Sequence, residues 1–388
     1  MTQWNPNLFR IEGRSRGYSE DYLNALIRQG TKTNSQHLPV IFSLAHLARL
    51  SRVQYSDLHS IVSRQGIDLK DFPYKNFSIA KRSGGRRWIS IPNPKLMSVQ
   101  QWINQSILRQ IQPHSAAFAY ARGRRLVDHA RQHCSCDWLV KIDIKDFFSN
   151  ISEIQIFSVF REAGYPKLLS FELARICTRV TPKRPGKRWK NSSNRHSIPE
   201  YYSEFIGSLP QGSPTSPALS NLACRKLDVE LTELALSSCS TYSRYADDLC
   251  FSLPSGDRKS ALKIMREACA VIQKHNFIPN EKKTRIIPPG GKKILTGLNV
   301  DSTTPTTPKE VRDMVRLHLY YAKKIGLAKH CEARGFRSIS GFQNHLSGLI
   351  GYISSIEPKR SSALYAQFNA LPWLHLTDQQ ASDPLISE

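Results

Sequence analysis

The sequence is poor in acidic residues: 31 Asp and Glu stand against 55 Lys and Arg, which gives a formal net charge of +24. It also lacks long hydrophobic runs, since the longest charge-free apolar stretch, residues 38–48, is shorter than the roughly 20 residues that cross a bilayer. The first residues show no basic segment followed by an apolar run, so no secretory signal is expected. We therefore expect a cytoplasmic protein with no membrane partner.

None of the eight cysteines belongs to a Cys-x-x-Cys pair, which argues against a zinc knuckle or a redox pair. Scattered thiols in such a chain fit a reducing compartment. His129 and His133 stand four residues apart, a helical spacing that can bind metal, but no Glu or Cys shares that face. A zinc site is therefore not expected.

The positive charge points to a polyanionic partner, chiefly nucleic acid, because Lys and Arg contacts with phosphate supply most of the sequence-independent affinity. A charge that serves only solubility is the competing explanation. With 40% hydrophobic and 9% aromatic residues the chain can form a core, and 388 residues allow two or three domains.

Hydrophobic periodicity predicts the elements of the chain. Two alternating runs, 77–81 and 87–91, flank a Ser-Gly-Gly turn and predict a β-hairpin with a basic tip. Further strands are expected at 138–144, 241–245, 249–253 and 293–300. Helical patterns cover 19–66, 96–111, a segment from about 154, 217–236, 261–275 and most of 309–371. Residues 183–205 are rich in basic and turn residues and read as a surface insertion.

Three carboxylates follow or join these strands. Asp247 and Asp248 lie between two predicted strands, where adjacent carboxylates repel each other unless a cation is near. Asp143 ends the strand at 138–144, and if these strands are neighbours the three acids converge on a site suited to Mg²⁺. Two such ions stabilise the attacking and leaving oxygens of phosphoryl displacement. From the residues alone, nucleotidyl transfer and nuclease cleavage both remain open.

Four segments, in this order, resemble sequence blocks of the reverse transcriptases. Residues 143–148 (Asp-Ile-Lys-Asp-Phe-Phe) resemble the first catalytic block, and 245–248 (Tyr-Ala-Asp-Asp) the polymerase signature. Residues 208–217 (Ser-Leu-Pro-Gln-Gly-Ser-Pro-Thr-Ser-Pro) are similar to the block that lines the nucleotide and primer site. Residues 280–284 (Asn-Glu-Lys-Lys-Thr) are similar to the block that follows. The ordered matches run from about residue 74 to 300.

The resemblance implies an α+β right-hand polymerase with fingers, an antiparallel-sheet palm and a helical thumb. The expected division is an N-terminal helical extension at 1–66, fingers at 67–138, a palm at 139–300 with the basic insertion at 183–205, a thumb at 301–371 and a tail at 372–388.

The resemblance also implies roles for single residues. Asp143, Asp247 and Asp248 would be catalytic and, with the main chain of Ile144, would hold two Mg²⁺ ions, for which Mn²⁺ can substitute. The expected nucleotide-binding residues are Lys81, Arg87, Phe148, Gln211, Gly212 and Lys283.

These nucleotide roles have physical reasons. Lys81 and Arg87 would fold over the triphosphate, where cations offset developing charge. Phe148 matches a ring that would clash with a 2′-hydroxyl and so select dNTPs; a core aromatic is the alternative. Lys283 would reach the phosphates, although a lysine in a basic run can also be merely solvated. Asp146 is expected to be a structural or surface acid.

Among reverse transcriptases, the chain is most similar to those of bacterial retrons, which copy part of a structured non-coding RNA into single-stranded DNA (msDNA) and commonly serve in anti-phage defence. Residues 129–133 (His-Ala-Arg-Gln-His) resemble the retron Asn-Ala-x-x-His motif with His in place of Asn. Residues 295–297 (Leu-Thr-Gly) resemble its Val-Thr-Gly motif. The expected partners are a cognate structured RNA, its DNA product, dNTPs and a retron effector protein.

The thumb carries basic residues interleaved with tyrosines that could stack on exposed bases. An ordinary helix with solvated lysines and core tyrosines is the alternative. The expected RNA-binding residues are His129, His133, Thr296, Gly297, Arg312, Arg316, Tyr320, Lys323 and Lys324.

Other functions remain open at this point. The chain could be a diversity-generating or abortive-infection reverse transcriptase, or a scaffold with a polymerase fold that binds RNA or an effector. A template-independent polymerase is a further alternative.

Overall fold

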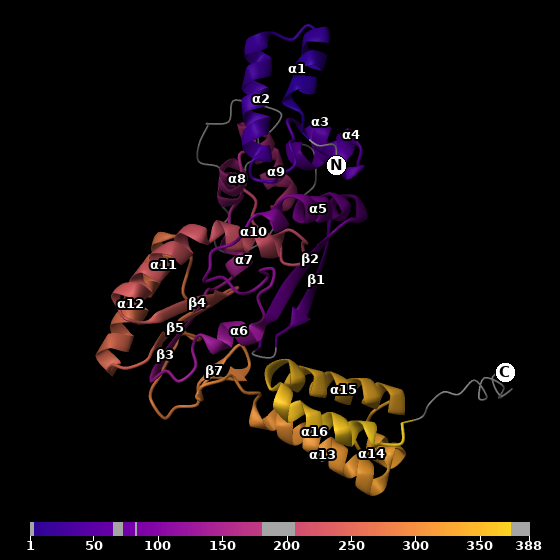
Figure 1. Ribbon diagram of the computed structural model, residues 1–388, viewed down its shortest axis with the longest axis vertical. Helices are drawn as coiled ribbons and strands as arrows, with labels where there is room; N and C mark the ends of the chain where they lie inside the picture. The colour runs from indigo at the N-terminus through magenta and orange to yellow at the C-terminus, as the bar shows by residue number, and fades with distance from the viewer. Residues whose placement is uncertain (1–3, 65–72, 82–83, 181–205, 374–388) are drawn as a thin grey trace, which may run out of the picture. The chain divides into compact units, whose positions relative to one another are not determined.

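A computed structural model describes residues 4–64, 73–81, 84–180 and 206–373 (Figure 1). The predicted insertion at 183–205 and most of the predicted tail at 372–388 lie outside these described residues. The chain divides into two compact units. Unit 1 contains residues 1–124, 140–251 and 259–286, and unit 2 contains residues 125–139, 252–258 and 287–388.

Four helices open unit 1, at the indigo end of Figure 1: α1 (Pro6–Ser15), α2 (Glu20–Asn34), α3 (Leu44–Ser51) and α4 (Tyr55–Ser63). Polar side chains fix where three of them begin. Asn5, Ser19 and Ser43 each accept a hydrogen bond from an amide in the first turn. The helical prediction for 19–66 is confirmed for α2 to α4, while α1 was not located by its pattern.

The predicted hairpin is present. Strands β1 (Tyr74–Ala80) and β2 (Arg86–Pro92) pair antiparallel, with Phe77 opposite Ile89. Gly84 and Gly85, with φ of 84° and 80°, occupy its turn in a conformation that glycine adopts at little cost. Helix α5 (Pro94–Ser106) follows at once and packs against β2.

A four-stranded sheet carries the acidic residues. Its strands are β3 (Trp138–Asp143), β4 (Thr241–Tyr245), β5 (Asp248–Leu253) and β6 (Arg285–Ile287), in the order β4-β5-β3-β6. The strand that ends at Asp143 is therefore the neighbour of the strand that begins at Asp248, which meets the condition that the sequence analysis set for the acids to converge. Helix α11 (Arg225–Ser237) packs on β4, and α12 (Arg258–Lys274) follows β5 in the chain.

A group of helices lies between β3 and β4 in the sequence. It consists of α7 (Phe147–Asn150), α8 (Glu153–Glu162), α9 (Lys167–Cys177) and α10 (Ser216–Ala223). Helix α9 packs on α8, α4 and α5, and α10 packs on α8. The single helix predicted at 217–236 is in fact two, α10 and α11, because Cys224 takes φ −85° and ψ 1° and leaves the helical conformation.

Unit 2 is mainly helical. Its elements are α6 (Leu126–Arg131), β7 (Ile294–Leu295), β8 (Leu298–Asn299), α13 (Lys309–Ile325), α14 (Leu327–Ala333), α15 (Ile339–Ile356) and α16 (Pro358–Asn369). The last four helices enclose a core that includes Val315, Leu319, Phe342 and Leu346. The continuous strand predicted at 293–300 is wrong: β7 and β8 form a hairpin that reverses at Thr296 and Gly297, whose φ angles are 47° and 84°.

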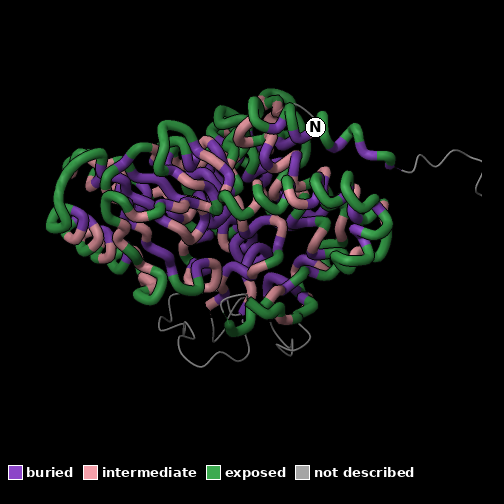
Figure 2. The backbone as a smooth tube through the Cα atoms, turned by 90° about the horizontal axis from the view of Figure 1, so that it is seen from below, coloured by how far each residue is buried: buried purple, intermediate pink, exposed green. Residues whose placement is uncertain are grey.

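Most elements contain both buried and exposed residues, which are coloured purple and green in Figure 2. Among the residues that the structure describes, no helix is long and apolar enough to cross a membrane.

Candidate active site

Asp143 ends β3 and is 5% exposed. Asn280 Nδ2 donates to its Oδ1 at 2.7 Å, and Lys283 Nζ donates to its Oδ2 at 2.7 Å. The Asn280 amide also donates to the Asp143 carbonyl at 2.7 Å. The segment at 280–284 therefore holds Asp143 in two ways: side chains bind its carboxylate, and a backbone amide binds its main-chain carbonyl.

The turn between β4 and β5 presents the other two acids. Ala246 takes the left-handed conformation, with φ 57°, which closes the turn directly before Asp247. The Ile144 amide donates to the Asp247 carbonyl at 2.9 Å, so the end of β3 is joined to this turn. Asp143 and Asp248 thus stand on two neighbouring strands, and Asp247 stands in the turn that leads into the second of them.

The three acids influence one another electrostatically. Burial and then the charge of Asp247 raise the pKa of Asp248 to about 6. Burial also raises the pKa of Asp247, and the charge of Asp143 adds to this, while Lys283 and Arg87 act in the opposite direction. Burial and neighbouring carboxylates therefore both disfavour the charged forms of Asp247 and Asp248, and a nearby cation would favour them.

The donor set suits divalent cations, although no ready-made ligand cluster is present. In the described part of the chain, no three His, Cys, Asp or Glu residues stand close enough together to hold a metal. The Asp143 carboxylate is directed at Asn280 and Lys283 instead. Carboxylate oxygens are nevertheless the ligands that hard divalent ions prefer, so the three acids fit such ions if the Asp143 carboxylate is released from Lys283.

A buried ion pair supports the turn between β4 and β5. Arg244 Nε and Nη2 donate to the two carboxylate oxygens of Asp228 at 2.8 and 2.6 Å, and both side chains are fully buried. Arg244 Nη1 donates to the Ala246 carbonyl at 3.2 Å, and Tyr242 Oη donates to Asp228 Oδ1 at 2.9 Å. The pair fixes the backbone immediately before Asp247. The sequence analysis did not identify it.

Phe148 stands five residues after Asp143 and is half-buried, whereas Phe147 is the buried core aromatic of the two. The Phe148 ring lies 5.5 Å from that of Phe147 and 6.4 Å from that of Tyr120, measured between ring centroids. Tyr120 is 55% exposed, and burial followed by the charge of Asp247 raises its pKa. Tyr120 is therefore a site residue that the sequence analysis missed.

The backbone explains why Tyr120 lies there. The Arg244 amide donates to the Ala116 carbonyl and the Phe118 amide donates to the Arg244 carbonyl, both at 2.8 Å. The segment before Tyr120 thus runs along β4. No motif marked it, because the signal is a long-range backbone pairing.

The β1–β2 hairpin and the loop at Gln211 are attached to each other. The Ser90 amide donates to the Gln211 carbonyl at 2.7 Å. Gly212 has φ 116°, and a Cβ there would come within 3.0 Å of the Ser90 carbonyl, so this position requires glycine. Arg87 is exposed on β2 and lowers the pKa of Asp247 by its charge, whereas Lys81 is exposed at the turn.

The structure does not support two of the predicted RNA contacts. His129 and His133 are both fully buried in unit 2, and His133 Nδ1 lies 2.7 Å from Ser252 Oγ. Burial, with a contribution from the charge of His129, lowers the pKa of His133 to about 3. Both rings are buried, and we assign them to packing. Thr296 and Gly297 form the β7–β8 turn, where Gly297 is exposed.

The predicted residues of α13 differ in their availability. Arg312 is largely covered and lies 3.8 Å from Glu357, which makes it an internal ion-pair residue. Tyr320 is 56% exposed, and Lys324 Nζ lies 5.4 Å from the centre of its ring. Lys323 is exposed as well.

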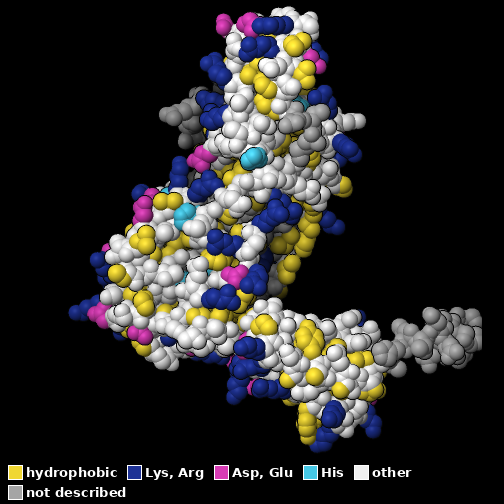
Figure 3. Space-filling view, in the orientation of Figure 1, with side chains coloured by type: hydrophobic (Ala, Val, Ile, Leu, Met, Phe, Trp, Pro, Cys, Tyr) yellow, Lys and Arg dark blue, Asp and Glu magenta, His cyan; other side chains and the backbone are white. Residues whose placement is uncertain are grey.

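Arg316 is exposed and pairs with Asp313 on the same helix at 3.3 Å. Residues 316, 320, 323 and 324 follow helical spacing and share one face of α13. Across the face drawn in Figure 3, basic side chains are far more widespread than acidic ones.

The chain is similar in sequence to known proteins. Residues 79–308 match the family described as "Reverse transcriptase (RNA-dependent DNA polymerase)". The chain is 29% identical to the retron Mx162 reverse transcriptase of Myxococcus xanthus, over 77% of this chain and 61% of that protein. It is 27% identical to the retron Ec86 reverse transcriptase of Escherichia coli, over 88% of this chain and 96% of that protein. It is 28% identical to the retron Ec73 reverse transcriptase of Escherichia coli, over 82% of this chain and 97% of that protein.

Proposed function

The chain belongs to the reverse transcriptase family, and we propose that it is an RNA-directed DNA polymerase of the retron type, which copies part of a structured non-coding RNA into msDNA. The family match covers more than half of the chain and confirms the expected α+β right-hand polymerase fold. The chain spans 61% of the Mx162 protein but nearly all of the two Escherichia coli relatives. The boundaries of fingers, palm and thumb remain predictions.

The observation that carries the proposal is the group of three acids on adjacent strands, held by the segments that resemble reverse transcriptase blocks. Asp143, Asp247 and Asp248 are the proposed metal ligands. Members of this family depend on divalent metal ions, and we propose two Mg²⁺ ions, with Mn²⁺ as a substitute. When bound, such ions would neutralise charge on the attacking and leaving oxygens of nucleotidyl transfer.

The remaining residues of the site bind and orient the nucleotide in this proposal. Arg87 and Lys283 are cations whose charge reaches the acids, and with Lys81 they are assigned to the triphosphate. Phe148 is assigned to the sugar, where its half-buried ring would exclude a 2′-hydroxyl. Gln211 is assigned to the incoming nucleotide, and Gly212 shapes its loop.

The proposed partner is a structured RNA, bound in part by the exposed face of α13 with Arg316, Tyr320, Lys323 and Lys324. The names of the curated relatives support the retron branch. A retron effector protein, a role in anti-phage defence and a cytoplasmic location belong to the same proposal.

Primer extension with dNTPs on an RNA template tests the catalytic assignment. The double variant Asp247→Asn, Asp248→Asn should lose at least about 100-fold in rate, because a preorganised charge contact is worth about 10²–10³ in rate. Asp146→Asn is the matched control: its carboxylate is exposed, and asparagine tolerates its left-handed backbone, with φ 49°. Normal extension by the double variant would overturn the assignment.

The retron assignment is tested by sequencing the nucleic acid that copurifies with the protein. A branched RNA–DNA species is expected. Bulk cellular RNA without attached DNA would contradict the retron type, while leaving the polymerase assignment to the extension assay.

A further inference from the structure

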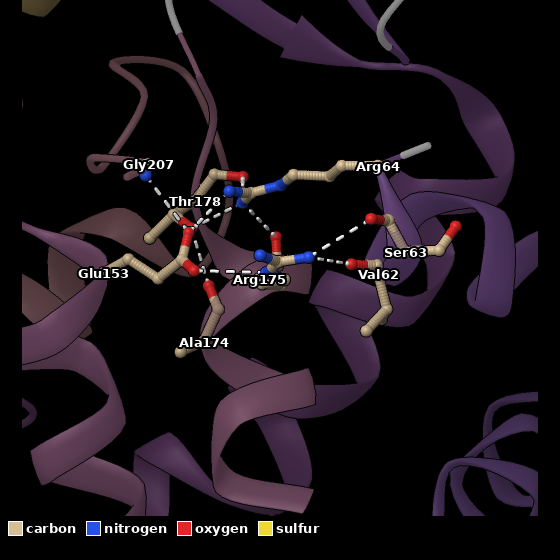
Figure 4. Close-up of polar contacts among 8 residues, drawn as sticks. All are labelled: Val62, Ser63, Arg64, Glu153, Ala174, Arg175, Thr178 and Gly207. Atoms are coloured by element: carbon tan, nitrogen blue, oxygen red, sulfur yellow. Dashed lines mark hydrogen bonds and ion pairs between the residues drawn. The ribbon is translucent and has the colours of Figure 1, made fainter. Parts of the chain in front are cut away.

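Glu153 is the centre of a buried polar cluster (Figure 4). It is the first residue of α8 and is 6% exposed. Arg64 Nη1 donates to its Oε2 at 2.6 Å, and Arg175 Nε donates to its Oε1 at 3.3 Å. Burial would raise the pKa of Glu153, but the two guanidinium groups outweigh it and hold the pKa below its ordinary value.

The two arginines connect Glu153 to the N-terminal helices. Arg64 follows the last residue of α4, and Arg175 Nη1 donates to the carbonyls of Val62 and Ser63 at 2.6 and 3.2 Å. Arg64 Nη2 in turn donates to the Arg175 carbonyl at 3.3 Å. The end of α4 and the end of α9 are thus held together around one carboxylate, as Figure 4 shows.

Gly207 closes the cluster on its other side. Its amide donates to Glu153 Oε2 at 3.1 Å, and its carbonyl accepts from the Glu153 amide at 2.8 Å. A Cβ at this position would lie 2.7 Å from both Glu153 Oε2 and Thr178 Oγ1. Thr178 Oγ1 itself lies 3.0 Å from Glu153 Oε2. The backbone at 207 is therefore seated directly on the carboxylate.

From Gly207 the chain reaches Gln211 through a series of backbone contacts. Ser208 exchanges two hydrogen bonds with Arg179, at 2.9 and 3.0 Å, and the Leu209 amide donates to the Ile151 carbonyl at 3.1 Å. The Gln211 carbonyl then accepts from β2. The segment from Gly207 to Gln211 is therefore anchored along its length, and the contact at Gly207 is one of those that set the position of Gln211.

We propose that Glu153, held between Arg64 and Arg175, is a positioning residue for the loop that carries Gln211, and that through it nucleotide binding depends on the N-terminal helices. The inference rests on the proposed function, which assigns Gln211 to the incoming dNTP. It adds Glu153, a residue that touches no substrate but sets the position of Gln211, which is assigned to contact the substrate.

The test uses the full chain and a mild change. Thr178→Val keeps the shape of the side chain but removes the hydroxyl that faces Glu153. Thr178→Ser keeps that hydroxyl. We expect Thr178→Val to raise the KM for dNTP about three- to tenfold, the equivalent of one hydrogen bond, with kcat nearly unchanged. Thr178→Ser should restore the KM. Gly207→Ala should raise the KM further, because its Cβ would displace the loop.

Controls separate positioning from general destabilisation. Gln29→Ala removes a different contact of the N-terminal helices, the 2.7 Å hydrogen bond from Gln29 Nε2 to the Gly164 carbonyl between α8 and α9. It should leave the KM unchanged, whereas partial unfolding would lower only the fraction of active enzyme. In a Gln211→Ala background, Thr178→Val should add no further increase.

Two outcomes overturn the inference in distinguishable ways. If the wild-type protein extends primers, and Thr178→Val and Gly207→Ala both have the wild-type KM for dNTP, the positioning role is wrong. If the wild-type protein makes no DNA, the proposed function fails, and the inference fails with it.

Discussion

The three acids of the site are chemically alike but differ in what surrounds them. Asp143 receives hydrogen bonds from Asn280 and Lys283, so its charge is compensated locally. Asp248 is half-buried next to Asp247, and its pKa is raised to about 6. A carboxylate with so little compensation favours cation binding. Within one site, the surroundings therefore divide the acids into Asp143, which is already paired, and Asp247 and Asp248, whose pKa values are raised.

Phe148 gives a test of sugar selection at the level of one side chain. Phe148→Ala should raise the incorporation of rNTPs relative to dNTPs by about tenfold or more, because the ring that would clash with a 2′-hydroxyl is removed. Single-nucleotide extension with matched dNTP and rNTP measures the ratio. Phe148→Tyr, which keeps the ring, should retain selection, and an unchanged ratio in Phe148→Ala would remove this residue from the site.

The place of the three acids at strand ends and in a strand–strand turn could be predicted from the sequence, but the residues that support them could not. Asp143, Asp247 and Asp248 stand in local patterns of strand and turn, which can be read from neighbouring residues. Tyr120 and the Arg244–Asp228 pair reach the site through contacts between distant segments, and no local pattern encodes them. His129 and His133 show the converse error: their spacing was visible, but their burial depends on what packs over them.

At the level of elements, mistaken predictions arose at backbone reversals. The run at 293–300 alternates like a strand, but Thr296 and Gly297 adopt positive φ and fold it into a hairpin. The run at 217–236 has helical periodicity throughout, yet it breaks at Cys224. Periodicity reports which side chains are buried, and it persists across a break when both halves pack on the same core.

The helices of unit 2 enclose a histidine pair. His318 Nδ1 lies 2.9 Å from His330 Nε2, and the two residues are 6% and 2% exposed. The His318 ring packs on Phe342 at 5.4 Å between centroids. Burial, followed by the charges of His330, His345 and Arg334, lowers the pKa of His318 to about 4.

This histidine should make unit 2 sensitive to acid. His318 stays neutral in the folded state down to about pH 4, whereas in the unfolded chain it binds a proton below about pH 6.5. The unfolded state then binds more protons, so the stabilisation is complete above pH 6.5 and is lost as the pH falls towards 4. Between pH 7 and 5 the free energy of unfolding should drop by about 2 kcal/mol because of this group.

Denaturant unfolding at pH 7, 6 and 5 checks this expectation. Between pH 7 and 5, the free energy of unfolding of His318→Phe should fall by about 2 kcal/mol less than that of the wild type. Phenylalanine cannot take up a proton, and it suits the aromatic surroundings. His37→Gln, at an exposed position in unit 1, is the control and should keep the wild-type loss. Equal losses in the wild type and His318→Phe would show that His318 does not carry the effect.

For the whole molecule, the net charge of +24 favours binding to RNA but does not say where the RNA lies. Two models make different predictions. If the charge acts as a diffuse field, any two exposed lysines contribute alike. If RNA lies on the exposed face of α13, Lys323 and Lys324 contribute through direct phosphate contacts, and Tyr320 contributes by stacking.

Salt dependence distinguishes the two models. Each phosphate contact with a single strand changes the slope of log K against log salt by about 0.7, so Lys323→Ala with Lys324→Ala should make the slope shallower by about 1.4. Tyr320→Ala should weaken binding by about 1–3 kcal/mol, with an unchanged slope, because stacking releases no counterions. Fluorescence anisotropy with a single-stranded RNA at several KCl concentrations measures both quantities.

The matched control removes the same charge elsewhere. Lys226 and Lys263 are 78% and 75% exposed, and they pair with Glu162 and Glu267 in unit 1. Lys226→Ala with Lys263→Ala also lowers the net charge by two, but it should leave the slope close to that of the wild type. If both double variants shift the slope equally, the diffuse field is the better description, and α13 is not the RNA-binding face. A shift confined to the α13 variant requires direct contact, because net charge is the same in both.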